Sequence, residues 1–199
     1  MIILSFDDIF IDDWNAHREY FKRKGIRANF FVCSLDSYTD EQWQKLVDLK
    51  NDGHAIAFHG YDHLRAGTET EYTIDAFIEK EIMRGILKMN AYGLTPRHYS
   101  YPWGNRSNLS DYRLLKIFKT LKVGGGGVYL PPLPRIYGAL NFGKGKGIPH
   151  VGALNAAIDG IVCLYMHKVM VERLDFLAEF ASRNGIEFKT LDDMEGNIK

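Results

Sequence analysis

Short apolar runs alternate with segments of helical periodicity along most of the chain. The apolar runs predict strands at Ile2–Phe6, Ala28–Cys33, Ala55–Phe58, His98–Tyr101, Lys122–Val123 or Val128–Leu130, Ile161–Met166 and Ile186–Lys189. This alternation is typical of βα units around a parallel sheet, so the pattern predicts the α/β class. Such strands either close into a barrel or form an open doubly wound sheet, and in both arrangements ligands bind at the carboxyl ends of the strands.

Three helices are marked by start and stop signals as well as by periodicity. The longest predicted helix covers Thr70–Asn90, which has a broad apolar face, and Gly93 follows it as a stop signal. A second helix begins after Thr39, because Gln42 stands three residues later in a capping-box pattern. A third helix follows the penultimate strand and has Gly185 at its carboxyl end.

The segment 124–147 interrupts this alternation because it is rich in Gly and Pro. We expect a long irregular loop here, and loops of this length in compact domains are often functional. Its run of four glycines lacks the Gly-Lys-Ser or Gly-Lys-Thr ending of a phosphate-binding loop, so it does not predict a nucleotide site.

The composition is that of an ordinary globular domain. Of the 199 residues 46% are hydrophobic, and 25 Lys and Arg balance 25 Asp and Glu. A chain of this length buries roughly 70% of the surface that its unfolded form exposes, so we expect one domain over residues 1–199. Nucleic-acid affinity comes mainly from clustered basic residues, so the balanced charge argues against a nucleic-acid partner.

Membrane insertion and export are not expected either. Charged residues interrupt every apolar stretch well before the roughly 18 to 20 residues that a membrane span needs. The first residues, Met1–Asp8, carry no basic leader, which does not fit a signal peptide and favours a cytoplasmic location. Cys33 and Cys163 lie inside apolar runs, where buried free thiols are favoured over a disulfide.

Residues suited to metal and proton chemistry follow three of the predicted strands. Asp7 and Asp8 end the first strand, where adjacent carboxylates repel each other unless a cation or donor lies near, although a helix-capping loop is the alternative. His59 and His63 follow the third strand, and four-residue spacing on a helical turn puts both imidazoles on one face. One carboxylate and two imidazoles at one strand edge would leave positions open on a metal ion for water and substrate. His167 follows another strand, where it would either exchange protons near pH 7 or fill a capping or core role.

A further candidate is the turn after the fourth predicted strand, within Tyr99–Gly104. Pro102 and Gly104 restrict its backbone, and Trp103 offers a backbone N–H and an aromatic face. The turn is either purely structural, or it supplies an oxyanion donor and a wall on which a sugar stacks.

Taken in order, these segments resemble the polysaccharide deacetylase (NodB-homology) family, carbohydrate esterase family 4. Phe6-Asp7-Asp8 is similar to the family's Thr-Phe-Asp-Asp-Gly motif, and the segment 24–32 resembles its second strand. Gly53-His54 with His59 and His63 is similar to the Gly-His-(x)4-His-(Ser/Thr)-x-x-His motif. Tyr99–Gly104 resembles the Tyr-Pro-aromatic-Gly form of the third motif, and Leu164–His167 resembles the Leu-x-x-His motif.

The resemblance implies a distorted (β/α)7 barrel that removes an acetyl group, usually N-acetyl, from a sugar or glycan. It implies that Asp8, His59 and His63 bind one divalent metal ion, commonly zinc. It further implies that Asp7 is the general base, that His167 is the general acid, and that the backbone N–H of Trp103 helps to stabilise the oxyanion. An acetylated sugar, oligosaccharide or polysaccharide would be the substrate.

The chain departs from the family pattern at three positions. Ile9 stands where the family has Gly, which would place a bulky side chain near the site and narrow it. Ser100 stands where many members have an Arg that orients the base, and we expect Arg135 from the long loop, rather than Arg97, to replace that Arg. Gly60 replaces the Ser or Thr that follows the first ligand histidine.

Three other functions are compatible with parts of this pattern. A sugar-binding homologue that has lost catalysis would explain the departures. A non-heme iron oxygenase also uses two His and one carboxylate, but usually on an all-β scaffold. A glycosidase is disfavoured because catalytic carboxylates stand at least roughly 5 Å apart across the glycosidic bond, which adjacent Asp residues seldom achieve. Metal-assisted hydrolysis of an O-acetyl ester also remains open.

Overall fold

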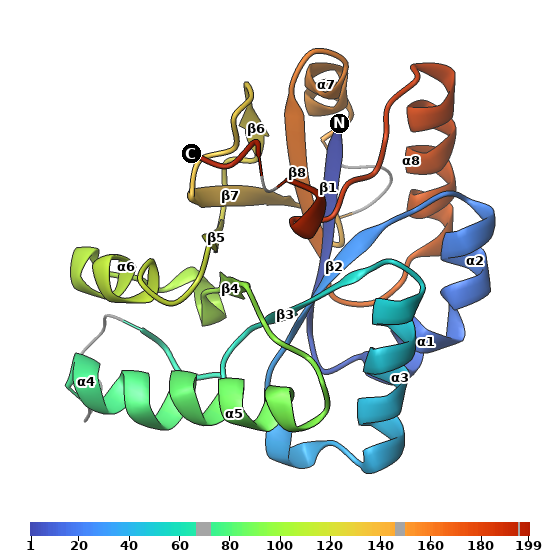
Figure 1. Ribbon diagram of the computed structural model, residues 1–199. Coiled ribbons are helices and arrows are strands. Elements are labelled where there is room, and N and C mark those ends of the chain that lie inside the picture. Colours follow the sequence, from blue (N-terminus) through green and yellow to red (C-terminus); the bar gives the residue numbers. More distant parts are fainter. Residues whose placement is uncertain (67–72, 146–149, 195) are drawn as a thin grey trace.

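A parallel sheet that closes on itself forms the centre of the protein. The computed structural model describes residues 1–66, 73–145, 150–194 and 196–199. Its strands are β1 (Ile2–Asp8), β2 (Ala28–Val32), β3 (Ala55–Phe58), β4 (His98–Ser100), β5 (Thr120–Gly124), β6 (Val128–Tyr129), β7 (Ile136–Asn141) and β8 (Ile161–Met166). Seven of them are parallel in the order β1-β2-β3-β4-β5-β7-β8, and β8 pairs back with β1 (Figure 1). The expected distorted (β/α)7 barrel is therefore confirmed.

The register shows where the barrel is tightly joined and where it is distorted. Leu4 of β1 lies opposite Ala28 of β2 on one side and Leu164 of β8 on the other. By contrast, β3 and β4 share only the pair Phe58 and Tyr99. The two-residue strand β6 adds to β8 in the antiparallel direction. Closure through β1 and β8 places the first and the last strand of the chain side by side.

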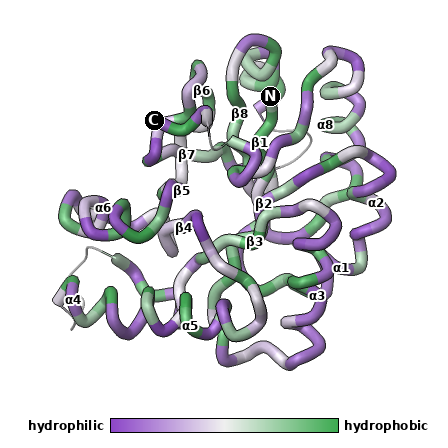
Figure 2. The backbone as a smooth tube through the Cα atoms, in the orientation of Figure 1, coloured by the Kyte–Doolittle hydropathy of each residue, from purple (hydrophilic) through white to green (hydrophobic). Residues whose placement is uncertain are grey.

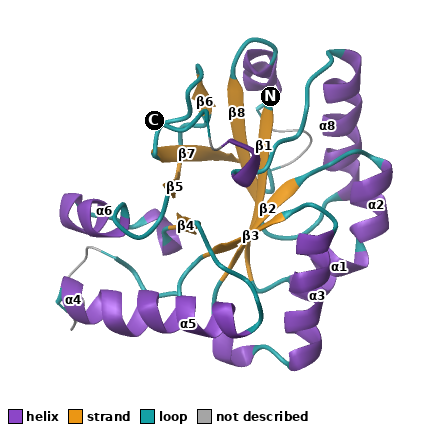
Figure 3. Ribbon diagram, viewed as in Figure 1, coloured by secondary structure: helices purple, strands orange, loops and turns teal. Residues whose placement is uncertain are grey.

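Helices surround the sheet, as Figure 3 shows in purple. They are α1 (Ile11–Ala16), α2 (Arg18–Arg23), α3 (Asp40–Asn51), α4 (Ile74–Phe77), a π-helical segment (Ile78–Met83), α5 (Arg84–Ala91), α6 (Asn108–Leu114), α7 (Val151–Leu154) and α8 (Val171–Arg183). The predicted capping box is confirmed: Thr39 accepts from the Gln42 N–H, and the Gln42 side chain accepts from the Thr39 N–H. The predicted helix Thr70–Asn90 is confirmed from Ile74 onwards, and its first residues lie outside the described ranges. Among the described helices, none has the length and the apolar composition that a membrane span requires.

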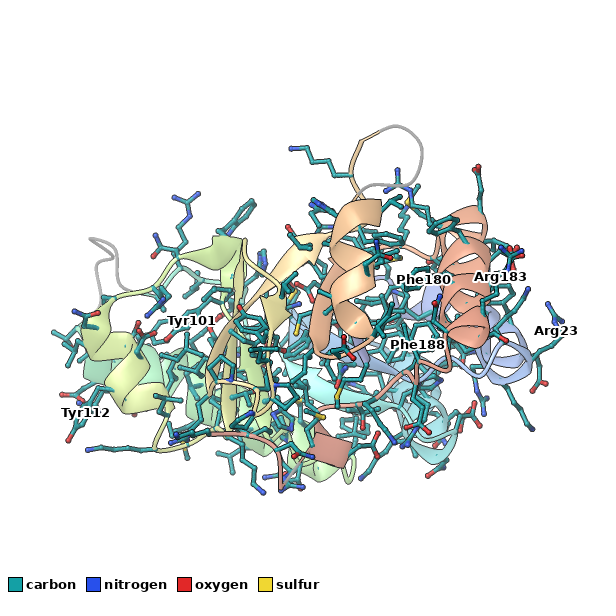
Figure 4. The ribbon with its side chains drawn as sticks, turned by 90° about the horizontal axis from the view of Figure 1, so that it is seen from above. Arg23, Tyr101, Tyr112, Phe180, Arg183 and Phe188 are labelled. Carbon is teal, nitrogen blue, oxygen red and sulfur yellow. The ribbon has the colours of Figure 1, made fainter. Side chains whose placement is uncertain are left out.

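Alternation along β1 separates two parts of the core. Leu4 and Phe6 face the helices, where Phe6 stacks on Phe30 with ring centroids 5.2 Å apart. Ile3 belongs to a second cluster, inside the barrel, and Asp7 follows it with the period of two that a strand imposes. Figure 2 colours most of β1 and β8 as hydrophobic, and Figure 4 shows Tyr112 on the outer side of α6. Asp7 therefore points into the barrel at its carboxyl-terminal end.

The segment 124–147 is more regular than its composition predicts. It contains β7, where the prediction of an irregular loop is wrong, and β6, which confirms the strand predicted at Val128–Leu130; the alternative strand, Lys122–Val123, lies in β5. A Cβ atom on Gly138 would lie 1.6 Å from the carbonyl oxygen of Gly125, so the glycine allows two backbone segments to touch. The predicted strand Ile186–Lys189 is reduced to a single bridge between Phe188 and Ile2, because β1 is already paired on both sides.

Candidate active site

A pocket of about 340 Å³ opens at the carboxyl ends of the barrel strands. Its wall is built from residues at or just after five strand ends: Asp7, Asp8, His59, His63, Ser100, Tyr101, Trp103, Gly104, Lys122, Val123, Gly124, Tyr165 and His167. Six of the seven residues predicted for the site are among them. The structure thus brings together side chains that are up to 160 residues apart in the sequence.

Three of these side chains form a close triangle of metal-ligating atoms. The Nε2 atoms of His59 and His63 lie 3.2 Å apart, and the Oδ1 atom of Asp8 lies 3.3 and 3.5 Å from them. Nitrogen and oxygen ligands held tetrahedrally at about 2.0–2.1 Å from a zinc ion stand about 3.3 Å apart. The spacing of the three donors therefore fits one ion of that size without rearrangement.

Hydrogen bonding fixes the tautomer of one ligand. Nδ1 of His59 lies 2.8 Å from the carbonyl oxygen of Ser100, which can only accept, so Nδ1 carries the proton. The Nε2 lone pair then faces the carboxylate of Asp8 and the ring of His63, an arrangement that a cation between them stabilises. Two imidazole nitrogens and one carboxylate oxygen are a donor set of the kind that binds a divalent metal ion.

The protonation states of the ligands agree with this assignment. Burial opposes ionisation of Asp8, but contact with His59, and then with His167 and His63, holds the pKa of this carboxyl below its ordinary value while no metal ion is bound. Burial, and then the charge of His59, lowers the pKa of His63 and favours the neutral imidazole that binds a metal.

Cys33 also lies near Asp8 and His63. Burial raises the pKa of its thiol well above the ordinary range, so it is a poorer ligand than His59.

Asp7 has a partner that sequence reasoning missed. The ammonium of Lys122, on β5, donates to Oδ1 of Asp7 and lies 3.1 Å from the hydroxyl of Ser5. Lys122 and Asp7 are only 2% and 5% exposed, so the ion pair is buried in the barrel. Burial lowers the pKa of Lys122, and the charge of Asp7 opposes that shift. The pair holds the Asp7 carboxylate in one place beside the metal triad.

The structure corrects the expectation for Arg135. Its guanidinium donates to the carbonyl oxygens of Leu115, Phe118 and Lys119, at 2.6 to 2.9 Å. Arg135 immediately precedes β7 and therefore lies at the amino-terminal edge of the barrel, opposite the pocket. It is Lys122 that supplies a cation to Asp7.

His167 and Trp103 flank the triad. His167 follows β8, and its Nε2 atom lies 3.6 Å from Oδ2 of Asp8 while its side chain is 45% exposed. Trp103 is 68% exposed, and its ring lies against that of His63, with centroids 5.1 Å apart. Among the described residues no hydrogen-bond acceptor is paired with the backbone N–H of Trp103. An imidazole and an N–H donor thus remain available to a bound molecule.

Backbone strain is concentrated around the pocket. Asp8, His63 and Trp103 have φ values of 86°, 61° and 61°, which non-glycine residues rarely adopt. Such conformations persist only where the surrounding structure imposes them, and they cluster at functional sites.

The departures from the family pattern have different consequences. Ile9 is 48% exposed and does not line the pocket, so the expected narrowing is not observed. Ser100 contributes its carbonyl oxygen to His59. Gly60 has a φ of 99°, a value that suits glycine.

Comparison with known proteins agrees with this geometry. The Polysaccharide deacetylase family model matches residues 1–120. No curated protein sequence matches the chain.

Solved structures extend the likeness over nearly the whole chain. A family 4 carbohydrate esterase from Streptomyces lividans, in complex with acetate, is 17% identical with a TM-score of 0.70, covering 98% of this chain and 95% of that one. The Bc1960 peptidoglycan N-acetylglucosamine deacetylase is 17% identical with a TM-score of 0.70 and coverages of 97% and 86%. The chitin deacetylase from Colletotrichum lindemuthianum is 14% identical with a TM-score of 0.69 and coverages of 97% and 86%. At these identities the structures show a shared fold. The family match, over more than half of the sequence, shows that the chain belongs to the polysaccharide deacetylase family.

Proposed function

We propose that the protein is a metal-dependent hydrolase that removes an acetyl group, most often N-acetyl, from a sugar, oligosaccharide or polysaccharide. The observation that carries this proposal is the Asp8–His59–His63 triangle beside the buried pair of Asp7 and Lys122, in one pocket. The names of the structural relatives, which include peptidoglycan and chitin deacetylases, support the choice of substrate class.

The metal ligands would be Asp8, His59 and His63. Two imidazoles and one carboxylate suit zinc, and three protein ligands leave coordination open. When bound, the ion would polarise the acetyl carbonyl and make water a stronger acid.

The other residues divide the proton transfers between two sides of the pocket. Asp7 would accept a proton from the attacking water, and Lys122 would keep its carboxylate in place. His167 is half exposed at the rim, where its imidazole would donate a proton to the departing amine. The backbone N–H of Trp103 would donate to the oxygen that becomes negative.

Metal analysis tests the first part of the proposal. We expect about one zinc or similar ion per chain in protein purified without chelators and loss of the ion in the double variant His59→Ala, His63→Ala. His17→Ala, His150→Ala is the matched control, because it removes two histidines that do not line the pocket. Absence of metal from the wild type, even after zinc is added, would overturn the metal-dependent mechanism.

Turnover tests the second part. Release of acetate from N-acetylated chitooligosaccharides should exceed release from O-acetylated xylan, and Asp7→Asn should reduce it by about 100-fold or more. Full activity of Asp7→Asn would refute the assigned base. Glycan binding without turnover under several divalent metals would instead indicate a sugar-binding protein that has lost catalysis.

A further inference from the structure

We infer that Glu81 is a positioning residue that holds the metal ligand His63 in place. This inference rests on the proposed function, because it assigns Glu81 a role at the proposed metal site. Glu81 lies 18 residues beyond His63 in the chain, in the π-helical segment Ile78–Met83, and does not line the pocket.

The carboxylate of Glu81 accepts hydrogen bonds from the backbone on both sides of His63. Its Oε2 atom accepts from the N–H of Asp62, and its Oε1 atom accepts from the N–H of Leu64, each at 2.9 Å. Glu81 is fully buried. A buried carboxylate needs strong hydrogen bonds to offset its lost hydration, so this contact strongly restricts the turn.

The turn needs such support because His63 itself is strained. Its φ of 61° lies in the left-handed region, which non-glycine residues adopt only where the surrounding structure holds them there. Without the two bonds to the neighbouring N–H groups, the backbone at His63 would relax to more common angles. The imidazole would then move away from His59 and Asp8.

The packing of the helix that contains Glu81 against β3 brings Glu81 close to the turn around His63. Gly85 lies four residues further along the helix, and a Cβ atom on it would stand 2.2 Å from the ring of Phe58 in β3. The glycine therefore lets the helix approach the end of the strand that leads into His59. Single turns of π-helix occur often at functional sites, where they reposition a side chain within a helix.

Gly60 and Glu81 fit each other at the start of the turn. A Cβ atom on Gly60 would lie 2.5 Å from Oε1 of Glu81, closer than real contacts allow. Gly60 is the position where the family pattern has a Ser or Thr. A side chain at position 60 would displace the carboxylate, so glycine at this position allows Glu81 to reach the turn.

Zinc affinity in the purified protein, measured by competition with a chromophoric chelator, tests the role. We expect Glu81→Gln to weaken zinc binding about 10- to 100-fold, the usual effect of removing a group that orients a ligand, and Glu81→Ala to weaken it further. The amide oxygen of Gln still accepts from one N–H, whereas its NH2 group faces the other. Asp193→Asn is the control, because Asp193 also accepts from a backbone N–H, of Thr190, but outside the pocket and without contact to the triad. It should lower stability and leave zinc affinity unchanged.

Hydrogen exchange gives a readout that does not depend on metal. The amides of Asp62 and Leu64 should exchange faster in Glu81→Gln than in the wild type without metal, while amides of β1 keep their rates. Unchanged exchange at these two amides, or unchanged zinc affinity in both Glu81 variants, would overturn the positioning role. If the wild type bound no zinc, the proposed function would be refuted. The exchange rates would still show whether Glu81 stabilises the backbone around His63.

A double-mutant cycle of Gly60→Ala and Glu81→Ala separates two effects of the new Cβ atom: its collision with the Glu81 carboxylate and the backbone strain at residue 60. The strain at φ of 99° is the same in both backgrounds and cancels, so Gly60→Ala should weaken zinc binding more in the wild type than in Glu81→Ala. Equal effects in the two backgrounds would contradict the proposed fit between Gly60 and the carboxylate.

Discussion

Replacing Lys122 by Met tests whether the buried ion pair stabilises the barrel and also positions the carboxylate of Asp7, the proposed base. Met keeps most of the aliphatic stem that packs between the rings of Phe31 and Tyr165, where the ammonium lies 4.3 and 5.2 Å from the ring centroids. The change therefore removes the charge, together with its hydrogen bonds to Asp7 and Ser5 and its cation–π contacts, and keeps most of the apolar packing. Ser5 keeps its hydrogen bond to the carbonyl oxygen of Leu164, at 3.1 Å.

The expected cost follows from the burial of both partners. Removing one member of a buried pair leaves the other charge uncompensated and costs about 3–5 kcal/mol of unfolding free energy. For a protein of this length, each kcal/mol lowers the melting temperature by about 2–4 °C, so Lys122→Met should melt roughly 6–20 °C lower. Activity should fall through kcat, because the Asp7 carboxylate loses the group that fixes its position.

Urea unfolding at pH 7, followed by circular dichroism, measures this cost. The double variant Asp7→Asn, Lys122→Met should be more stable than Lys122→Met alone, because it removes the unpaired charge as well. A loss below about 1 kcal/mol in the single variant, or strictly additive losses in the double variant, would refute the energetic coupling of the pair.

Three further outcomes follow from other contacts. Burial lowers the pKa of His54 to about 4 from 6.5, and its Nδ1 atom accepts from the Ala28 N–H, so between those pH values the unfolded state binds more protons than the folded state. Stability should therefore decrease by about 3 kcal/mol as pH falls from 6.5 to 4, and urea titrations at several pH values should show a shallower decrease in His54→Gln. Gly85→Ala should lower stability by about 1–3 kcal/mol despite the better helix propensity of Ala, because its Cβ atom meets the Phe58 ring; a stabilised variant would contradict that packing. Arg135→Ala should lose about 1–3 kcal/mol of stability yet keep kcat/KM within about twofold. A large loss of kcat/KM in the folded variant would instead indicate that Arg135 acts in the active site.

The sequence predicts the strands whose burial is continuous and misses those with mixed composition. β1, β2, β3 and β8 coincide with the apolar runs, because both of their faces are covered. β7 contains Gly138 and follows a Pro-rich stretch, signals that favour a loop when only neighbours in the sequence are considered. Gly138 is required because its backbone contacts Gly125, and this contact exists only in the folded chain.

The candidate site divides in the same way. The grouping of Asp8, His59 and His63 could be predicted because each of them stands beside a strand end and within a recognisable spacing. Lys122 could not, because a lysine within a strand is ordinarily a solvent-facing residue, and its partner Asp7 lies 115 residues away. Glu81 lies in a helix whose periodicity gave no reason to separate one carboxylate from the other charged residues of that segment.

The left-handed backbone at Asp8, His63 and Trp103 has a consequence for how the protein can change. Each of these conformations is less costly for Gly or Asn than for the residue present, so replacements that ease folding are available at all three positions. Each would also remove a proposed ligand or reshape the wall of the pocket. Variants selected for thermal resistance alone should accumulate such replacements here and lose activity, whereas variants selected for turnover should keep these residues and gain their stability at positions remote from the pocket.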